Sequence, residues 1–151
     1  MKRNVFILFS IFLCLSATLM VSAQSDSVIA TISKAIVDTD AGKLQGFIRN
    51  GTFTFRGIQY ATSERFGLPQ KVAKWSGVKG ALTYGPISPI APMTAVSNDE
   101  FFNAHRYWPQ NEVCQNLNIW TQGIKDSKKR PVMVWLHGGG HSNGSAIEGV
   151  A

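Results

Sequence analysis

The chain has 151 residues, of which 44% are hydrophobic and 16% charged, and its formal net charge is +6 at pH 7. This composition is typical of one globular domain and excludes collagen-like, coiled-coil and disordered chains. The basic residues form no wide stripe. We interpret the dense run Lys128–Arg130 as a solvated loop, so we expect no nucleic-acid binding.

The first predicted element is a secretory signal peptide over residues 1–23. The pair Lys2-Arg3 gives a positive start, residues 5–20 are apolar, and Val21–Ala23 supplies the small residues of a cleavage site. The alternative is a retained membrane anchor, but the apolar run is short for a span of about 20 residues. We therefore expect cleavage after Ala23, no stable membrane anchor, and a secreted or periplasmic mature chain over residues 24–151.

The first half of the mature chain predicts short strands joined by tight turns. A strand is expected over residues 35–37, and turn residues follow over 38–42. Residues 43–49 alternate weakly, and Asn50-Gly51 then gives a hairpin signal before a strand over 52–55. Asn50 also begins a glycosylation sequon, but the turn explains the glycine as well.

The second half contains a long irregular stretch and two further predicted strands. Residues 60–109 are interrupted repeatedly by proline and glycine, which predicts an extended surface loop around a larger body. Residues 117–120 and 131–136 are strand candidates. The second run is apolar on both faces, as in a central strand covered on both sides. Because the chain offers little to cover it, we expect an incomplete domain.

The motif that carries chemistry is His137-Gly138-Gly139-Gly140, directly after that predicted central strand. Glycines adopt positive φ and leave their N–H groups uncrowded, so such groups can stabilise a developing oxyanion. A strand followed by this motif is typical of lipases and esterases. The alternatives are a flexible turn or a phosphate loop, but a phosphate loop would need a following Gly-Lys-Ser/Thr. No metal site is expected, because the histidines lack ligand spacing.

Several further segments are spread in a fixed order over nearly all of the mature chain. They are Gly42–Gly46, Phe55–Ala61, Arg65-Phe66 with Pro69 and Trp75, Tyr84–Pro86, Glu112–Asn118, Pro131–Gly140 and Gly144-Ser145. In sequence and order these segments resemble the type-B carboxylesterase family, which includes cholinesterases and bacterial carboxylesterases.

The resemblance has departures from the family pattern. Gln59 replaces a proline, Val113 an aspartate, Gln115 a leucine, and His141 a usual aromatic residue. The family's buried structural ion pair maps to Arg65 and Glu112, and both are present.

The resemblance also leaves Cys114 without its family partner. The family's disulfide would join Cys114 to a position near Ser88, where no cysteine stands. Because Cys14 leaves with the signal peptide, Cys114 either pairs outside this sequence or is a buried free thiol.

Ser142 stands in a literal G-x-S-x-G sequence, yet we interpret it as a decoy. A nucleophile serine follows its strand almost directly and opens a helix. Ser142 lies beyond the glycines, no helix-forming stretch follows, and only Glu148 and no histidine come after it. The nucleophile, acid and base are therefore expected outside this chain.

The resemblance implies the N-terminal portion of an α/β-hydrolase, truncated before the nucleophile. The parent protein would hydrolyse small-molecule carboxylic esters through an acyl-enzyme, without a cofactor. Gly139 and Gly140 would donate N–H groups to the oxyanion. The alternatives are a non-catalytic binding module of the same fold and an inactive truncated product.

Overall fold

The computed structural model describes residues 28–31, 34–90, 109–140 and 144–147. These residues form short strands and no helix, so none of them belongs to a helix that could cross a membrane. The predicted signal peptide lies outside the described residues. The strands are β1 (Val28–Ile29), β2 (Ile36–Asp38), β3 (Lys43–Gln45), β4 (Phe47–Arg49), β5 (Thr52–Gln59), β6 (Ala61–Thr62), β7 (Gln70–Lys71), β8 (Val78–Gly80) and β9 (Asn116–Thr121).

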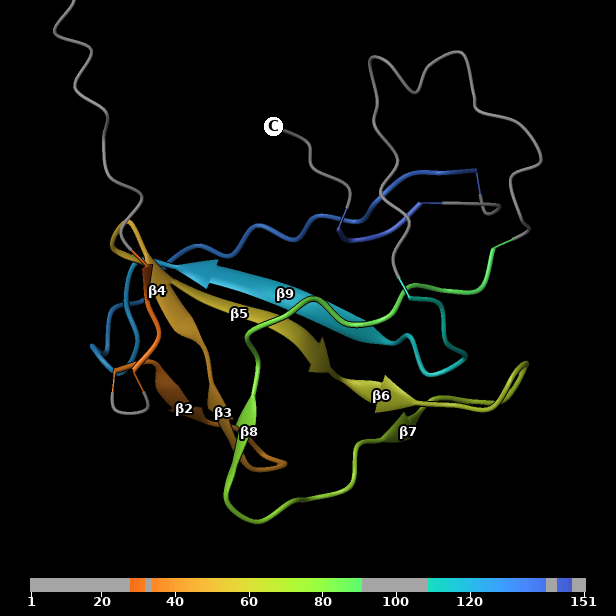
Figure 1. Cartoon of the computed structure of the whole chain (residues 1–151), viewed down its shortest axis with the longest axis horizontal. Coiled ribbons are helices and arrows are strands. Elements are labelled where there is room, and N and C mark those ends of the chain that lie inside the picture. The colour runs from red at the N-terminus through yellow and green to blue at the C-terminus, as the bar shows by residue number, and fades with distance from the viewer. Residues whose placement is uncertain (1–27, 32–33, 91–108, 141–143, 148–151) are drawn as a thin grey trace, which may run out of the picture.

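The strands are arranged in three small sheets (Figure 1). Strands β1, β4, β5 and β9 form an antiparallel sheet in that order, with the long strands β5 and β9 side by side. Strand β3 pairs antiparallel with β2 and parallel with β8 in the second sheet. Strands β6 and β7 pair with each other. The core lies where β3 and β5 meet the chain just after β8, and it is built on Leu44, Phe55 and Ala81.

The predicted Asn50-Gly51 hairpin is confirmed. Both residues have positive φ, +48° and +77°, and the flanking residues Arg49 and Thr52 face each other across the two-residue loop. A turn of this type needs positive φ at both central positions, which asparagine and glycine adopt most readily. The strands expected over residues 35–37, 52–55 and 117–120 also form, with shifted or longer bounds as β2, β5 and β9.

The weakly alternating run 43–49 is two strands rather than one. The chain turns at Gly46 from β3 into β4, and each strand joins a different sheet. The N–H of Gly46 donates to the carbonyl of Ala35 at 2.8 Å. A Cβ at Gly46 would lie 2.3 Å from the Thr54 carbonyl oxygen, so the close approach of β5 requires glycine here.

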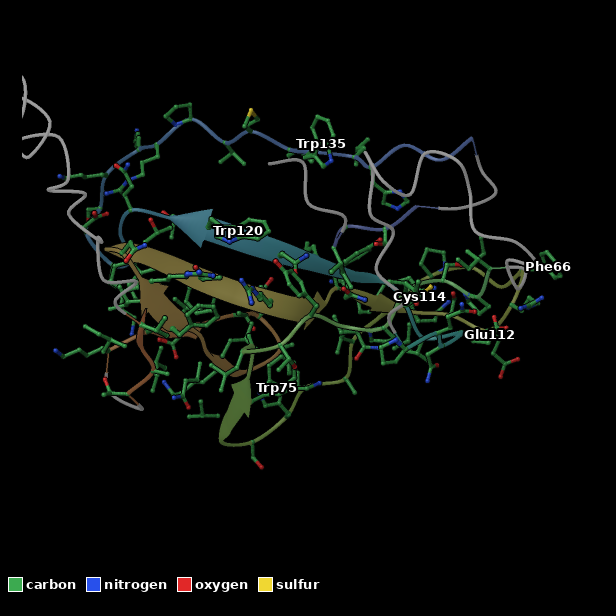
Figure 2. The ribbon with its side chains drawn as sticks, turned by 45° about the horizontal axis from the view of Figure 1, so that its top comes forward. Phe66, Trp75, Glu112, Cys114, Trp120 and Trp135 are labelled. Carbon is green, nitrogen blue, oxygen red and sulfur yellow. The ribbon has the colours of Figure 1, made fainter. Side chains whose placement is uncertain are left out.

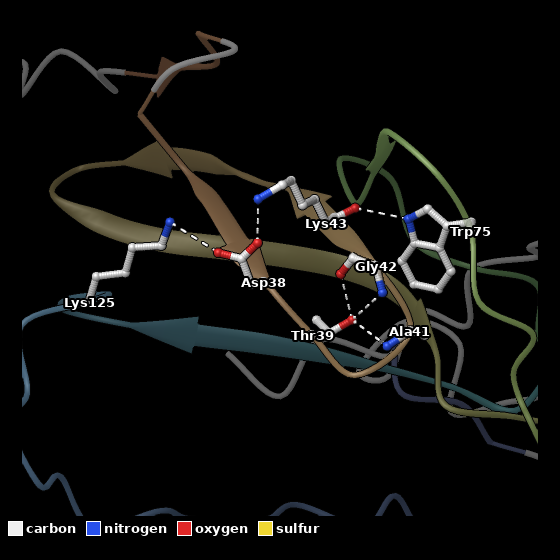
Figure 3. A network of polar contacts seen from close by, with 7 residues as sticks. All are labelled: Asp38, Thr39, Ala41, Gly42, Lys43, Trp75 and Lys125. Atoms are coloured by element: carbon white, nitrogen blue, oxygen red, sulfur yellow. Dashed lines mark hydrogen bonds and ion pairs between the residues drawn. The ribbon is translucent and has the colours of Figure 1, made fainter.

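A polar network fixes the turn between β2 and β3 (Figure 3). The hydroxyl of Thr39 donates to the carbonyl of Gly42 at 2.7 Å, and Trp75 Nε1 donates to the carbonyl of Lys43 at 3.1 Å. Lys43 and Lys125 both contact the carboxylate of Asp38. The hydrogen bond from Lys43, and then its charge, lower the pKa of Asp38.

Two predictions for the second half of the chain are wrong. The stretch 60–109 is not only loop, because it contributes β6, β7 and β8, and β8 extends a sheet by parallel pairing. Residues 131–136 form no strand: the side chains from Val132 to Leu136 are 68–93% exposed, and Trp135 stands on an unpaired segment (Figure 2). A strand needs a partner for its backbone groups, and no described strand pairs with this run.

A β-bulge interrupts the pairing of β5 with β9. Phe55 faces Ile119 and Ile58 faces Leu117, so two residues of β5, Arg56 and Gly57, stand opposite the single residue Asn118. The N–H of Arg56 donates to the carbonyl of Ala81 at 2.8 Å, and the N–H of Gly57 donates to Asn118 Oδ1 at 3.0 Å. Both N–H groups therefore bond outside the regular ladder.

We predict that Gly57→Ala destabilises the protein far more than Gly51→Ala. Both glycines have positive φ, which costs an L-residue roughly 1–2 kcal/mol. At Gly57 an added Cβ would also lie 2.7 Å from Thr83 O and from Gly85 N, whereas at Gly51 no atom lies within 4 Å. Crowding of this kind costs a further ~1–3 kcal/mol. Urea unfolding followed by tryptophan fluorescence measures both variants, and equal losses would contradict the assignment of a crowded bulge.

Candidate functional site

The glycine segment after His137 has the backbone conformation that its sequence predicts. Gly139 and Gly140 have φ of +120° and +60°, a region that favours glycine. No atom lies within 4 Å of a Cβ built on Gly138 or on Gly140. The chain at Gly138 and Gly140 is thus uncrowded. The role of Gly139 and Gly140 as oxyanion donors stays a prediction.

The loop that follows the glycines returns against their first turn. Gly144 has φ of +95°, and a Cβ there would lie 2.3 Å from the carbonyl oxygen of Gly138 and 2.8 Å from His137 Nδ1. His137 Nδ1 lies 2.8 Å from the same carbonyl oxygen, which accepts a hydrogen bond when the ring carries its proton on Nδ1. Gly144 is therefore required for the two ends of the loop to meet. Ser142, His141, His105 and Glu148 lie outside the described residues.

Beyond Gly144 the chain is anchored in the body of the protein. Ser145 and Ile147 are buried, and the Ile147 N–H donates to Ser145 Oγ at 3.3 Å. One contact to this segment was not predicted from the sequence: Asn118 Nδ2 donates to the carbonyl of Ala146 at 3.2 Å. The available signal was an amide side chain in the middle of a strand that is otherwise apolar over residues 117–120.

The Arg65–Glu112 ion pair forms as the resemblance implies, but it is not buried. Arg65 Nε donates to Glu112 Oε1 at 3.0 Å, and Arg65 Nη2 contacts the same oxygen. The two side chains are 59% and 50% exposed. The hydrogen bond and the charge of Glu112 raise the pKa of Arg65. The pair ties the loop after β6 to the segment before β9.

Cys114 lies near this ion pair, at the side of the molecule that also carries Phe66 (Figure 2). Cys114 forms no disulfide within the described residues and is half-buried, so the alternative of a buried free thiol is wrong as to its burial. Pairing with a cysteine outside this sequence stays a prediction. In the described residues no group of three or more histidine, cysteine, aspartate or glutamate side chains could hold a metal ion.

A bidentate ion pair stands immediately before the exposed apolar run. Arg130 Nη1 donates to Asp126 Oδ1 at 2.8 Å, and Arg130 Nη2 donates to Asp126 Oδ2 at 2.5 Å. The Lys128 N–H adds a contact to Oδ1 at 3.3 Å. The hydrogen bond from Arg130 dominates in holding the pKa of Asp126 well below its usual range. This pair closes the turn that leads from β9 towards Pro131.

Comparisons with known proteins agree on one family. Residues 33–150 match the model of the carboxylesterase family. Phenmedipham hydrolase of Pseudarthrobacter oxydans is 37% identical over 120 residues, which are 76% of this chain and 23% of that protein. Carboxylesterase 1E of Mus musculus is 37% identical over 150 residues, which are 89% of this chain and 27% of that protein.

Solved structures give the same result. An esterase from Clostridium hathewayi, described as able to hydrolyse aliphatic aromatic polyesters, matches with a TM-score of 0.75 and 44% identity over 82% of this chain and 24% of that one. A PNB esterase also matches, with a TM-score of 0.63 and 32% identity over 75% of this chain and 23% of that one. Both structural relatives are α/β-hydrolases, which confirms the predicted fold class at that level. The chain spans 23–27% of the length of the curated relatives described above.

We predict that the Asp126–Arg130 pair makes stability depend on acid pH. Because the pKa of Asp126 is lower in the folded chain than its unfolded value of about 3.9, the pair stabilises the fold above that value. The contribution is lost as pH falls below about 4 towards the folded pKa.

Asp126→Asn should therefore lower the urea midpoint near neutral pH and flatten its fall below pH ~4. Arg130→Gln should produce the same change, and the double variant should add little to either single one. If the urea midpoints of the wild type and of Asp126→Asn fall in parallel as the pH is lowered, the Asp126–Arg130 ion pair does not persist in solution.

Proposed function

The chain belongs to the carboxylesterase family, and from that premise we propose that the longer protein containing it is an exported serine hydrolase of small-molecule carboxylic esters. In this proposal a serine attacks the ester carbonyl, the alcohol leaves from a tetrahedral intermediate, and water then hydrolyses the acyl-enzyme. The negative charge on the intermediate is the charge that backbone N–H groups must stabilise.

The conformation of Gly139 and Gly140 carries the proposal. Both have positive φ directly after His137-Gly138, and both lie on a loop whose return leg packs against its own start. A loop that holds backbone N–H donors in place before the charge develops can act as an oxyanion hole, which is how such a site accelerates acyl transfer. We assign Gly139 and Gly140 as two donors, with a third from the residue after the nucleophile.

The exposed run Val132–Leu136 supports the idea that the rest of the catalytic apparatus comes from further sequence. Five consecutive apolar side chains are 68–93% exposed here, although burial of one such side chain is worth about 1.5–3 kcal/mol. In the longer protein we expect further sequence to cover this run, which leads directly into the glycine loop. The nucleophile, acid and base then lie beyond residues 24–151.

We predict that replacing either oxyanion glycine disables the longer protein. Gly139→Ala or Gly140→Ala adds a side chain at positive φ and displaces a donor, so kcat should fall by roughly 100-fold or more. Ser142→Ala is the control on the same loop and should change kcat by only a small factor. Initial-rate assays with a nitrophenyl ester measure kcat for all three variants.

The 151-residue chain alone should show no ester turnover above a protein blank, because an oxyanion loop without a nucleophile has no group to acylate. If this chain hydrolyses the ester and Ser142→Ala abolishes the activity, Ser142 is the nucleophile and the assignment of the loop fails.

We also predict export with cleavage after Ala23. This prediction rests on the charged pair Lys2-Arg3, the apolar residues 5–20 and the small residues Val21–Ala23. N-terminal sequencing of the protein recovered from the periplasm or medium should begin at Gln24. A protein that keeps Met1 and stays in the membrane fraction would contradict both the cleavage and the localisation.

A further inference from the structure

We propose that Asn118 is a positioning residue for the oxyanion loop, a role that rests on the proposed esterase function. Its side-chain amide joins two parts of the chain that the backbone ladder does not connect. Oδ1 accepts from the Gly57 N–H at 3.0 Å, and Nδ2 donates to the Ala146 carbonyl at 3.2 Å. The body of the sheet is thereby bonded to the return leg of the glycine loop.

The bulge in β5 makes the amide acceptor necessary. Gly57 has φ of +63°, and its N–H meets no backbone acceptor on β9 because the register is shifted there. Asn118 is the one residue of β9 that faces the two bulged residues. Its side-chain oxygen fills the gap in the ladder, which fixes the orientation of the amide. With Oδ1 committed to Gly57, Nδ2 is directed at Ala146.

Ala146 is connected to the oxyanion glycines through a few intervening residues. Ala146 lies between Ser145 and Ile147, which are 6% and 8% exposed, so the segment is held on both sides of the hydrogen bond. Two residues earlier, Gly144 lies so close to Gly138 that a Cβ built on it would stand 2.3 Å from the Gly138 carbonyl oxygen. A shift of residues 144–147 therefore disturbs Gly138 and the two glycines that follow it.

Only an amide satisfies both partners at this position. Aspartate keeps the acceptor for Gly57 but has no N–H for Ala146, and it turns a negative oxygen towards a carbonyl. Serine is one bond shorter and cannot reach Ala146. Asn118→Asp therefore removes the link to the loop while keeping the acceptor for Gly57, and Asn118→Ser removes the link without adding a charge.

Asn116 provides a matched control on the same strand. It lies two residues before Asn118 on the same face of β9, and it too is half-buried. Its Nδ2 donates to the carbonyls of Pro86 and Cys114 at 2.8 and 2.9 Å, away from the glycine loop. Asn116→Asp thus removes comparable hydrogen bonds without touching residues 144–147.

The test compares Asn118→Asp, Asn118→Ser and Asn116→Asp in the longer protein with a nitrophenyl ester. A small displacement of catalytic groups costs up to about 100-fold in rate, so both Asn118 variants should lower kcat by roughly 10- to 100-fold while KM changes less than about twofold. Asn116→Asp should lower the urea midpoint to a similar extent but keep kcat per folded molecule. Backbone amides of residues 144–147 should exchange hydrogen faster in the Asn118 variants only.

The outcomes separate the two proposals. If the wild type hydrolyses the ester and the Asn118 variants match Asn116→Asp in kcat, the positioning role is overturned while the esterase function stands. If the wild type hydrolyses no ester, the esterase function fails, and the catalytic part of the inference fails with it. Unchanged hydrogen exchange at residues 144–147 in both Asn118 variants overturns the link itself, whatever the activity.

Discussion

Strand β5 is the constraint on which the rest of the structure depends. It pairs with β4 through a two-residue hairpin and with β9 across the other edge, and its Phe55 lies in the core with Leu44 and Ala81. At its bulge, the N–H of Arg56 donates to the carbonyl of Ala81 after β8, and the N–H of Gly57 donates to Asn118 Oδ1. The bulge thus connects β5 to the chain after β8 on one side and, through Asn118, to the segment after the glycine loop on the other. Shifting its register by one residue would turn Phe55 out of the core and lose both connections.

Local chemistry explains which parts of the fold could be predicted from the sequence. Asn50-Gly51 needs only its own conformational preference, and β5 and β9 carry enough β-branched and aromatic residues to be recognised. The break at Gly46 and the parallel pairing of β8 could not be predicted, because both depend on residues distant in sequence: Thr54 and Phe55 crowd Gly46, and β3 supplies the partner of β8. The run 131–136 shows the opposite failure, since its strong local pattern does not form a strand without a partner.

The candidate site divides in the same way. His137–Gly140 is contiguous in sequence, so its motif and its backbone conformation could be predicted together. The Arg65–Glu112 pair was expected only through resemblance, and its exposure became known only from the surroundings in the structure. The hydrogen bond from Asn118 to Ala146 joins residues 28 apart and depends on a bulge that no pattern in the sequence indicates. Contacts that hold the glycine loop are thus harder to predict from the sequence than the loop itself.

The separation of β5 and β9 along the chain has a consequence for folding during synthesis. The β4–β5 hairpin can close within about 1–10 μs of leaving the ribosome, because its loop has two residues. Gly57 and Asn118 are 61 residues apart, so at ~5–20 residues per second β9 arrives roughly 3–12 s later. Over that interval the edge of β5 that later pairs with β9, including the N–H of Gly57, has no native neighbour. A nascent chain in this state offers an open strand edge to any chaperone or neighbouring nascent chain that reaches it first.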